Sequence, residues 1–228
     1  MNTRIFFASV AAAAILATPV AAEPIQFDVE FVDHIEAGLP EQDVYIERWT
    51  ETGTVFRPSP DDANEDAQLF LAAEPVAHNP FDATDVGPFE RGEPLDMTLG
   101  EWRSAEGAGS YVCENGAGHL QVEFSDLVPN GVYTLWHFFM SSTPTQPFIG
   151  TYDLPIGALD GSQSIFTADA DGNAVFDQAF ENCLQLSGEQ LAAGLALNWH
   201  SDSQTYGVLP GDFGQNAHIQ LFAILPAM

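Results

Sequence analysis

The sequence contains no lysine and only five arginines, against 33 aspartates and glutamates. Its formal net charge is −28 at pH 7. Nucleic acids and anionic membrane surfaces are bound mainly through Lys and Arg contacts to phosphate, so the composition argues against both as partners. We expect the charge to serve solubility, with the holding of divalent cations at the surface as an alternative use.

Long apolar runs are also scarce. The longest, residues 5–17, is shorter than the roughly 20 residues that a membrane-spanning helix needs. Arg4 precedes this run and small residues follow it, so residues 1–22 are predicted to be a signal peptide, with a membrane anchor as the alternative. No cysteine stands directly after the run, which excludes a lipoprotein anchor. We therefore expect a periplasmic or secreted protein with no transmembrane segment after signal cleavage.

The chain has only two cysteines, Cys113 and Cys183. In an exported protein such a pair is predicted to form one disulfide bond. Because both thiols are then used, neither a thiolate metal site nor a cysteine nucleophile is expected.

Recognisable catalytic motifs are missing as well. The sequence has no Gly-x-Ser-x-Gly elbow, and nothing singles out two of its many acids as a glycosidase pair. Non-enzymatic function is therefore favoured, and a carbohydrate-active enzyme is kept as an alternative. Of the four tryptophans, Trp136 and Trp199 lie inside apolar strands and are predicted to be core residues. Trp102, which follows a predicted strand, is the candidate for stacking on a sugar ligand.

The ordered parts of the sequence have the pattern of β-strands. In residues 25–32 the odd positions are apolar and the polar residues fall on even positions, a period of two that is typical of half-buried strands. Many short strands separated by turn residues predict an all-β fold, an antiparallel β-sandwich of the jelly-roll or Ig-like kind. The further predicted strands are residues 44–49, 54–57, 68–72, 95–100, 110–114, 118–124, 132–140, 163–167, 174–180, 195–200, 205–209 and 217–225.

Two segments interrupt this pattern. Residues 74–94 contain four prolines and no period, which predicts a surface excursion within a single domain spanning residues 23–228. Ser187 and Gln190 fit a helix capping box, and Gly194 fits a helix stop, so one short helix is predicted near residues 187–194.

A resemblance emerges at residues 127–136, which contain the pattern Pro-x-x-x-Tyr-Thr-x-Trp. Together with the acidic, glycine-containing turn at residues 167–174, this strand resembles those of uncharacterised secreted bacterial β-sandwich proteins. The resemblance implies the fold and carries no chemistry. Asp169, Asp171 and Asn173 in this turn also allow a calcium interpretation, but Gly172 stands at the wrong position for an EF-hand loop, so a hairpin turn is favoured.

The histidines provide the most specific chemical hypothesis. His119, His200 and His218 each lie on the more polar parity of a predicted strand. If these strands are neighbours, three imidazoles facing solvent could bind copper or zinc. A solvated sheet face with scattered histidines is the alternative. His137 shares the parity of apolar residues and is predicted to be a hydrogen-bonded core histidine.

The function predicted from the sequence is thus an exported, acidic, non-enzymatic β-sandwich that acts as a binding or surface-associated module. No cofactor is expected unless the histidines bind copper or zinc. A periplasmic metal-binding protein using His119, His200 and His218 is the first alternative, and a carbohydrate-active enzyme is the second.

Overall fold

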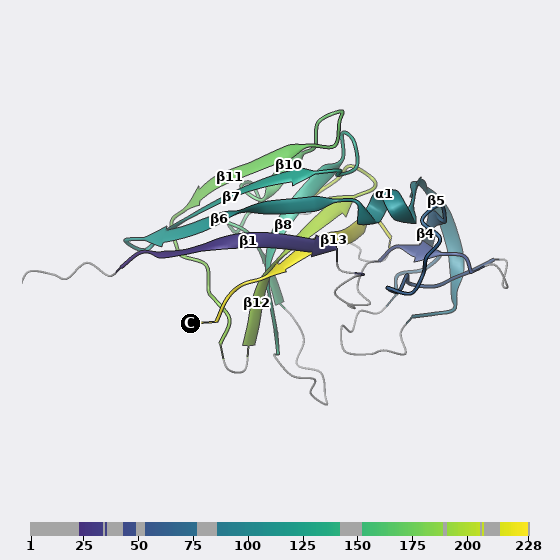
Figure 1. Cartoon of the computed structure of the whole chain (residues 1–228), viewed down its shortest axis with the longest axis horizontal. Coiled ribbons are helices and arrows are strands. Elements are labelled where there is room, and N and C mark those ends of the chain that lie inside the picture. The colour runs from purple at the N-terminus through teal and green to yellow at the C-terminus, as the bar shows by residue number, and fades with distance from the viewer. Residues whose placement is uncertain are drawn as a thin grey trace, which may run out of the picture.

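The computed structural model describes residues 23–33, 35, 43–48, 53–76, 86–141, 152–188, 191–205, 207 and 215–227. The predicted signal peptide therefore lies outside the described residues. The described chain is mostly antiparallel β, with two sheets and one short helix (Figure 1). Its elements are β1 (Ile25–Asp33), β2 (Tyr45–Ile46), β3 (Thr54–Val55), β4 (Gln68–Ala72), β5 (Phe89–Thr98), α1 (Leu99–Arg103), β6 (Glu106–Glu114), β7 (Ala117–Ser125), β8 (Val132–Ser141), β9 (Tyr152–Pro155), β10 (Ile165–Thr167), β11 (Ala174–Phe180), β12 (Leu191–His200) and β13 (Ala217–Ile224).

Nine of the described strands form the large sheet, in the order β10-β8-β12-β13-β1-β6-β7-β11, with β9 paired to β8. The sheet curls, so that β1, β6, β7 and β11 face the β8-β12-β13 half across the main core. Phe166 lies between the halves, with its ring 5.5 Å from that of Phe124 and 5.6 Å from that of Tyr133. The predicted all-β class is confirmed.

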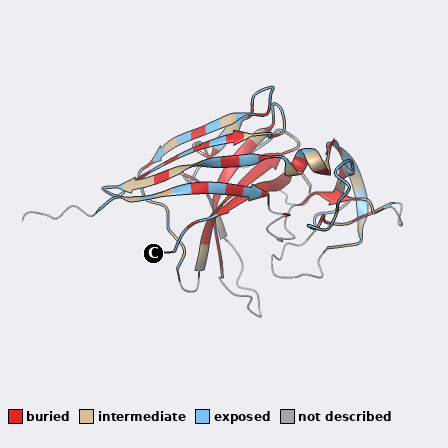
Figure 2. Ribbon diagram, viewed as in Figure 1, coloured by how far each residue is buried: buried red, intermediate tan, exposed pale blue. Residues whose placement is uncertain are grey.

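The two halves differ in how their strands are buried. Along β7 exposed and buried residues alternate, because one face packs on the core and the other faces solvent. Along β13 seven consecutive residues are buried, so this strand is covered on both faces. Figure 2 shows the alternation on β7 and β11 and the continuous burial of β13. On the second face of β8, β12 and β13, Trp136, Phe138 and Phe222 belong to a separate apolar cluster.

The small sheet has the order β2-β4-β5-β3 and its own apolar cluster around Tyr45, Val55 and Ala72. Asp43 and Arg57 form an ion pair of 3.3 Å whose side chains are both fully buried. The guanidinium of Arg57 also lies over the Tyr45 ring at 5.8 Å. Because an isolated buried charge is strongly unfavourable, these contacts fix both side chains in place.

Helix α1 joins the small sheet to the large one. It starts with a capping box in which the Thr98 hydroxyl accepts the backbone N–H of Glu101, and the Glu101 carboxylate accepts that of Thr98. Trp102 in this helix is fully buried, and its ring lies 6.0 Å from that of Trp199. The side-chain amide of Gln220 on β13 donates to the Trp102 carbonyl at 3.1 Å, which ties the helix to the sheet.

Two sequence predictions, for residues 187–194 and 74–94, differ from the structure. The helix predicted at residues 187–194 is wrong, because Leu191–His200 is strand β12, paired with both β8 and β13. The excursion predicted at residues 74–94 is shorter than expected, since β5 begins at Phe89, and residues 77–85 are outside the described set. The strand predicted at residues 205–209 lies largely outside the described residues, and neither Thr205 nor Gly207 is in a strand.

The predicted disulfide bond is present. Cys113 at the end of β6 is bonded to Cys183 after β11, with the Cα atoms 5.5 Å apart. The helical part of the described chain contains no segment with the length and apolar character needed to cross a membrane.

Candidate functional site

The solvent side of β1, β6, β7 and β11 is an ordered polar surface, which we call the outer face. In each strand every second residue is turned toward the core, so the residues between them point outward. The residues of the outer face include Asp28, Glu30, Val32, Glu106, Ala108, Ser110, His119, Gln121, Glu123, Ser125, Val175 and Asp177.

Strand register places the acids of this face in a grid. Ala108 of β6 is paired with Glu30 of β1 on one side and with Glu123 of β7 on the other. Glu30 and Glu123 are therefore two strands apart, about 10 Å at the usual strand spacing. Among the described residues no group of three His, Cys, Asp or Glu is arranged to hold a metal.

A groove of about 700 Å³ runs across the outer face, and its lining includes the carboxylates of Glu30, Glu106 and Glu123. Gly107 and Ala108 bring the backbone of β6 to its surface, and Val32 and Val175 add exposed apolar contact area. The groove is therefore shallow, acidic and partly apolar.

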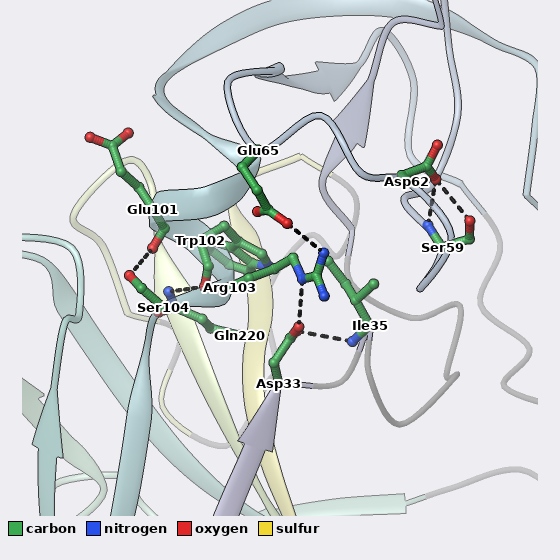
Figure 3. Close-up of polar contacts among 10 residues, drawn as sticks. All are labelled: Asp33, Ile35, Ser59, Asp62, Glu65, Glu101, Trp102, Arg103, Ser104 and Gln220. Carbon is green, nitrogen blue, oxygen red and sulfur yellow. Dashed lines mark hydrogen bonds and ion pairs between the residues drawn. The ribbon is translucent and has the colours of Figure 1, made fainter.

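The single cation in the groove lining, Arg103, is already neutralised. Its Nε lies 3.4 Å from Oδ2 of Asp33, and its Nη1 lies 2.9 Å from Oε1 of Glu65 (Figure 3). Asp33 is held in turn, because its Oδ1 accepts the backbone N–H of Ile35 at 3.0 Å. With the guanidinium held by two carboxylates, the potential of the groove is set by its remaining acids.

His119 lies on the outer face as its parity predicts, and its Nε2 is 2.6 Å from Oδ1 of Asp177 on β11. Both side chains are about half exposed. This exposed pair is therefore a surface contact across two neighbouring strands.

The three histidines proposed as a metal site do not converge. His200 and His218 lie on neighbouring strands, but His200 pairs with Ala217 and His218 with Trp199, so their rings lie on opposite faces of the sheet. Strand β7, which carries His119, is separated from β13 by β1 and β6. The prediction that His200 and His218 face solvent is wrong, because both side chains are buried. Their strands, β12 and β13, are covered on both faces.

The buried histidines are instead held by local hydrogen bonds. Nε2 of His200 lies 2.7 Å from Oγ1 of Thr134, which also accepts the Trp136 indole N–H at 2.7 Å. His137 is the hydrogen-bonded core histidine that the sequence predicts, with Nε2 3.0 Å from the carbonyl oxygen of Gln185.

Trp102 and the acidic turn at residues 167–174 both serve the fold. The Trp102 side chain is fully buried, so it offers no exposed ring for a sugar in this structure. In the turn, Oδ1 of Asp169 accepts the backbone N–H groups of Asp171 at 2.9 Å and Asn173 at 2.8 Å. These bonds, led by the one from Asn173, lower the pKa of Asp169. The carboxylate is thus used to close the hairpin turn.

The outer face was not singled out in the sequence as a site. Alternation in residues 25–32 and 118–124 gives the exposed parity of β1 and β7, but not that β6 lies between them. Register between strands far apart in the chain depends on tertiary packing, so the rows of the grid could not be assembled from local patterns.

Comparison with known proteins gives no match: no family model, no curated protein and no solved structure is similar to this chain. The resemblance to secreted β-sandwich proteins therefore remains a prediction.

Proposed function

We propose that the chain is an exported β-sandwich binding module whose outer face binds a cationic, extended segment of a partner protein. The observation that carries this proposal is the grid of separated carboxylates along a groove whose lining has only one, already paired, cation. The disulfide bond supports export, since such bonds persist in oxidising compartments.

The spacing of the acids favours a polycation over a single ion. Along β1, Asp28 and Glu30 are two residues apart on the same face, which corresponds to about 7 Å. Alternate side chains of an extended peptide have the same spacing, so alternate Lys or Arg residues can each meet one carboxylate. Val32 and Val175 would contact the aliphatic stems of those side chains.

The expected affinity is modest and depends on salt. An exposed ion pair contributes about 0–1 kcal/mol, so several pairs are needed for measurable binding. Screening shortens the reach of each charge to about 8 Å at physiological ionic strength.

The proposal is tested with a decapeptide of alternating Lys and Ala, titrated at about 20 mM NaCl against a variant carrying Glu30→Gln, Glu106→Gln and Glu123→Gln. We expect this variant to bind about tenfold more weakly, because three ion pairs of about 0.5 kcal/mol are lost. The matched control carries Glu74→Gln, Glu90→Gln and Glu181→Gln, three exposed acids outside the groove, and has the same net charge. Equal weakening by both variants would mean that only the overall charge acts, and would refute a site on the outer face.

A further inference from the structure

Ser201 and His218 meet at the end of the β12–β13 pair, away from the outer face. Ser201 directly follows β12, and His218 is the second residue of β13. The backbone N–H of Ser201 donates to the carbonyl oxygen of Asn216 at 2.9 Å, which extends the strand pairing by one step and fixes both backbones.

The hydrogen bonds of His218 define its tautomer. Its Nδ1 lies 2.7 Å from the backbone carbonyl oxygen of Asp43, and a carbonyl oxygen can only accept, so Nδ1 carries the proton. In the neutral ring Nε2 is then an acceptor. Nε2 lies 3.0 Å from Oγ of Ser201, so the serine hydroxyl donates to it. The alternative acceptor for this hydroxyl, the Asn216 carbonyl, is farther away at 3.4 Å.

The surroundings hold this geometry. His218 is fully buried, and its ring centroid lies 5.4 Å from that of Trp199. Asp43, whose carbonyl orients the ring, has its own carboxylate fixed by the buried ion pair with Arg57. Ser201 is only partly buried, so its hydroxyl is placed between a buried base and the surface.

We infer that Ser201 is a nucleophile activated by His218, with Asp43 as a positioning residue acting through its backbone carbonyl. A nucleophile bonded to a base whose second nitrogen is oriented by a third group is the arrangement used in covalent acyl transfer. This function is independent of the binding proposed for the outer face.

The chemical step is acyl transfer from an ester. The Ser201 oxygen bonds to the ester carbonyl carbon while its proton passes to Nε2 of His218. The carbon–oxygen bond to the alcohol then breaks, and the alcohol leaves with that proton. Water, deprotonated by the same nitrogen, attacks the acyl group on Ser201, which releases the acid and restores the hydroxyl.

A cavity of about 720 Å³ includes in its lining Asn216, whose carbonyl oxygen accepts the backbone N–H of Ser201. Phe70, Leu71 and Pro94 give the cavity an apolar wall. Arg91 also lines it, but its guanidinium is bonded to Glu47 at 2.6 Å and lies over the Phe70 ring. Glu93, Gln215 and Asn216 also line the cavity, so it offers an acyl chain an apolar wall beside a polar side.

The test is labelling with an alkyl fluorophosphonate, in which the Ser201 oxygen bonds to phosphorus, fluoride leaves and the proton passes to His218. We expect one label per chain, mapped to Ser201 by peptide mass spectrometry. Ser201→Ala should abolish labelling. Ser203→Gly, which removes a neighbouring serine whose positive φ suits glycine, should leave the rate unchanged.

His218→Asn keeps a donor toward the Asp43 carbonyl and removes the base, so the labelling rate should fall at least about 100-fold. Absence of labelling in the wild type, labelling at another residue, or an unchanged rate in folded His218→Asn would each overturn the inference. If circular dichroism shows that His218→Asn is unfolded, the deciding comparison is the wild-type rate in native and urea-denatured protein, which must differ in favour of the native state.

Discussion

Two ionisable side chains on the paired strands β8 and β9, the buried His137 and the half-buried Asp153, have pKa values shifted in opposite directions. Burial lowers the pKa of His137 to about 4, against a smaller raising effect of its hydrogen bond to Gln185. Burial raises the pKa of Asp153 to about 6. His137 is paired with Leu154 and Asp153 with Phe138, so the two groups point to opposite faces of the sheet.

For His137 the folded pKa lies below the unfolded value of 6.5. Its contribution to stability is complete above pH 6.5 and is lost as pH falls toward 4, by up to about 3 kcal/mol. We expect His137→Phe to be less sensitive to acid than the wild type. The free energy of unfolding in urea at pH 7 and pH 4.5 checks this, and an equal acid loss in both proteins would contradict it.

For Asp153 the folded pKa lies above the unfolded value of 3.8. The burial cost of its charged form is absent below pH 3.8 and is fully present above pH 6, where it reaches about 3 kcal/mol. Asp153→Asn should therefore be more stable than the wild type at pH 7, with the advantage shrinking toward pH 4. Urea titrations across this range measure the difference, and an advantage that grows on acidification would contradict the assignment.

At the scale of elements, β12 shows how a local signal can mislead. The Ser187 hydroxyl does accept a backbone N–H, as a capping residue would, but from Ala193 at 3.0 Å and not from the residue three positions on. It also donates to the Leu225 carbonyl at 2.6 Å. Pairing with β8 and β13 satisfies the backbone of this segment more fully than two helical turns would, so tertiary contacts override the local preference.

Strands with one exposed face were predictable, and so were β8 and β13, which are covered on both faces. β1, β7 and β11 alternate in burial and match their predicted positions, and the hairpin turn at Asn115 and Gly116 is where it was predicted. β6 begins at Glu106, four residues before the strand predicted at residues 110–114. β12 and β13 are covered on both faces. Alternate residues along these strands therefore point into two different buried layers, and neither set points to solvent. This is why His200 and His218 were wrongly expected at the surface. The capping box at Thr98 and Glu101 was readable in the sequence and marks the actual helix.

The disulfide bond links β6 to the segment after β11 and closes a loop of 70 residues. Constraining a loop of this length in the unfolded chain stabilises the fold by about 4 kcal/mol. The double variant Cys113→Ser and Cys183→Ser should lose stability of this order in urea unfolding under non-reducing conditions. Added reductant should lower the wild type toward the variant and leave the variant unchanged. A variant as stable as the oxidised wild type would contradict this role.

At the scale of the whole molecule, the charge should make stability depend on salt. Arg4 is the only charged residue in residues 1–22, so loss of that segment takes the net charge from −28 to −29. Self-repulsion at this charge disfavours the compact state, and salt screens it, with a Debye length of about 3 Å at 1 M. We expect Tm to rise as NaCl increases from about 10 mM to about 1 M. A flat or falling Tm in differential scanning calorimetry would contradict this.

Strand β1 belongs to both halves of the large sheet, pairing with β6 through residues 25–31 and with β13 through Val32 and Asp33. During synthesis β1 emerges before every other described strand, yet its second neighbour emerges after all of them. A chain interrupted before Ala217 would leave β1 and β12 each with an open edge, ready to pair with another molecule. The position of β1 therefore sets the order of assembly. The large sheet cannot become continuous until β13, the last described strand, has been made.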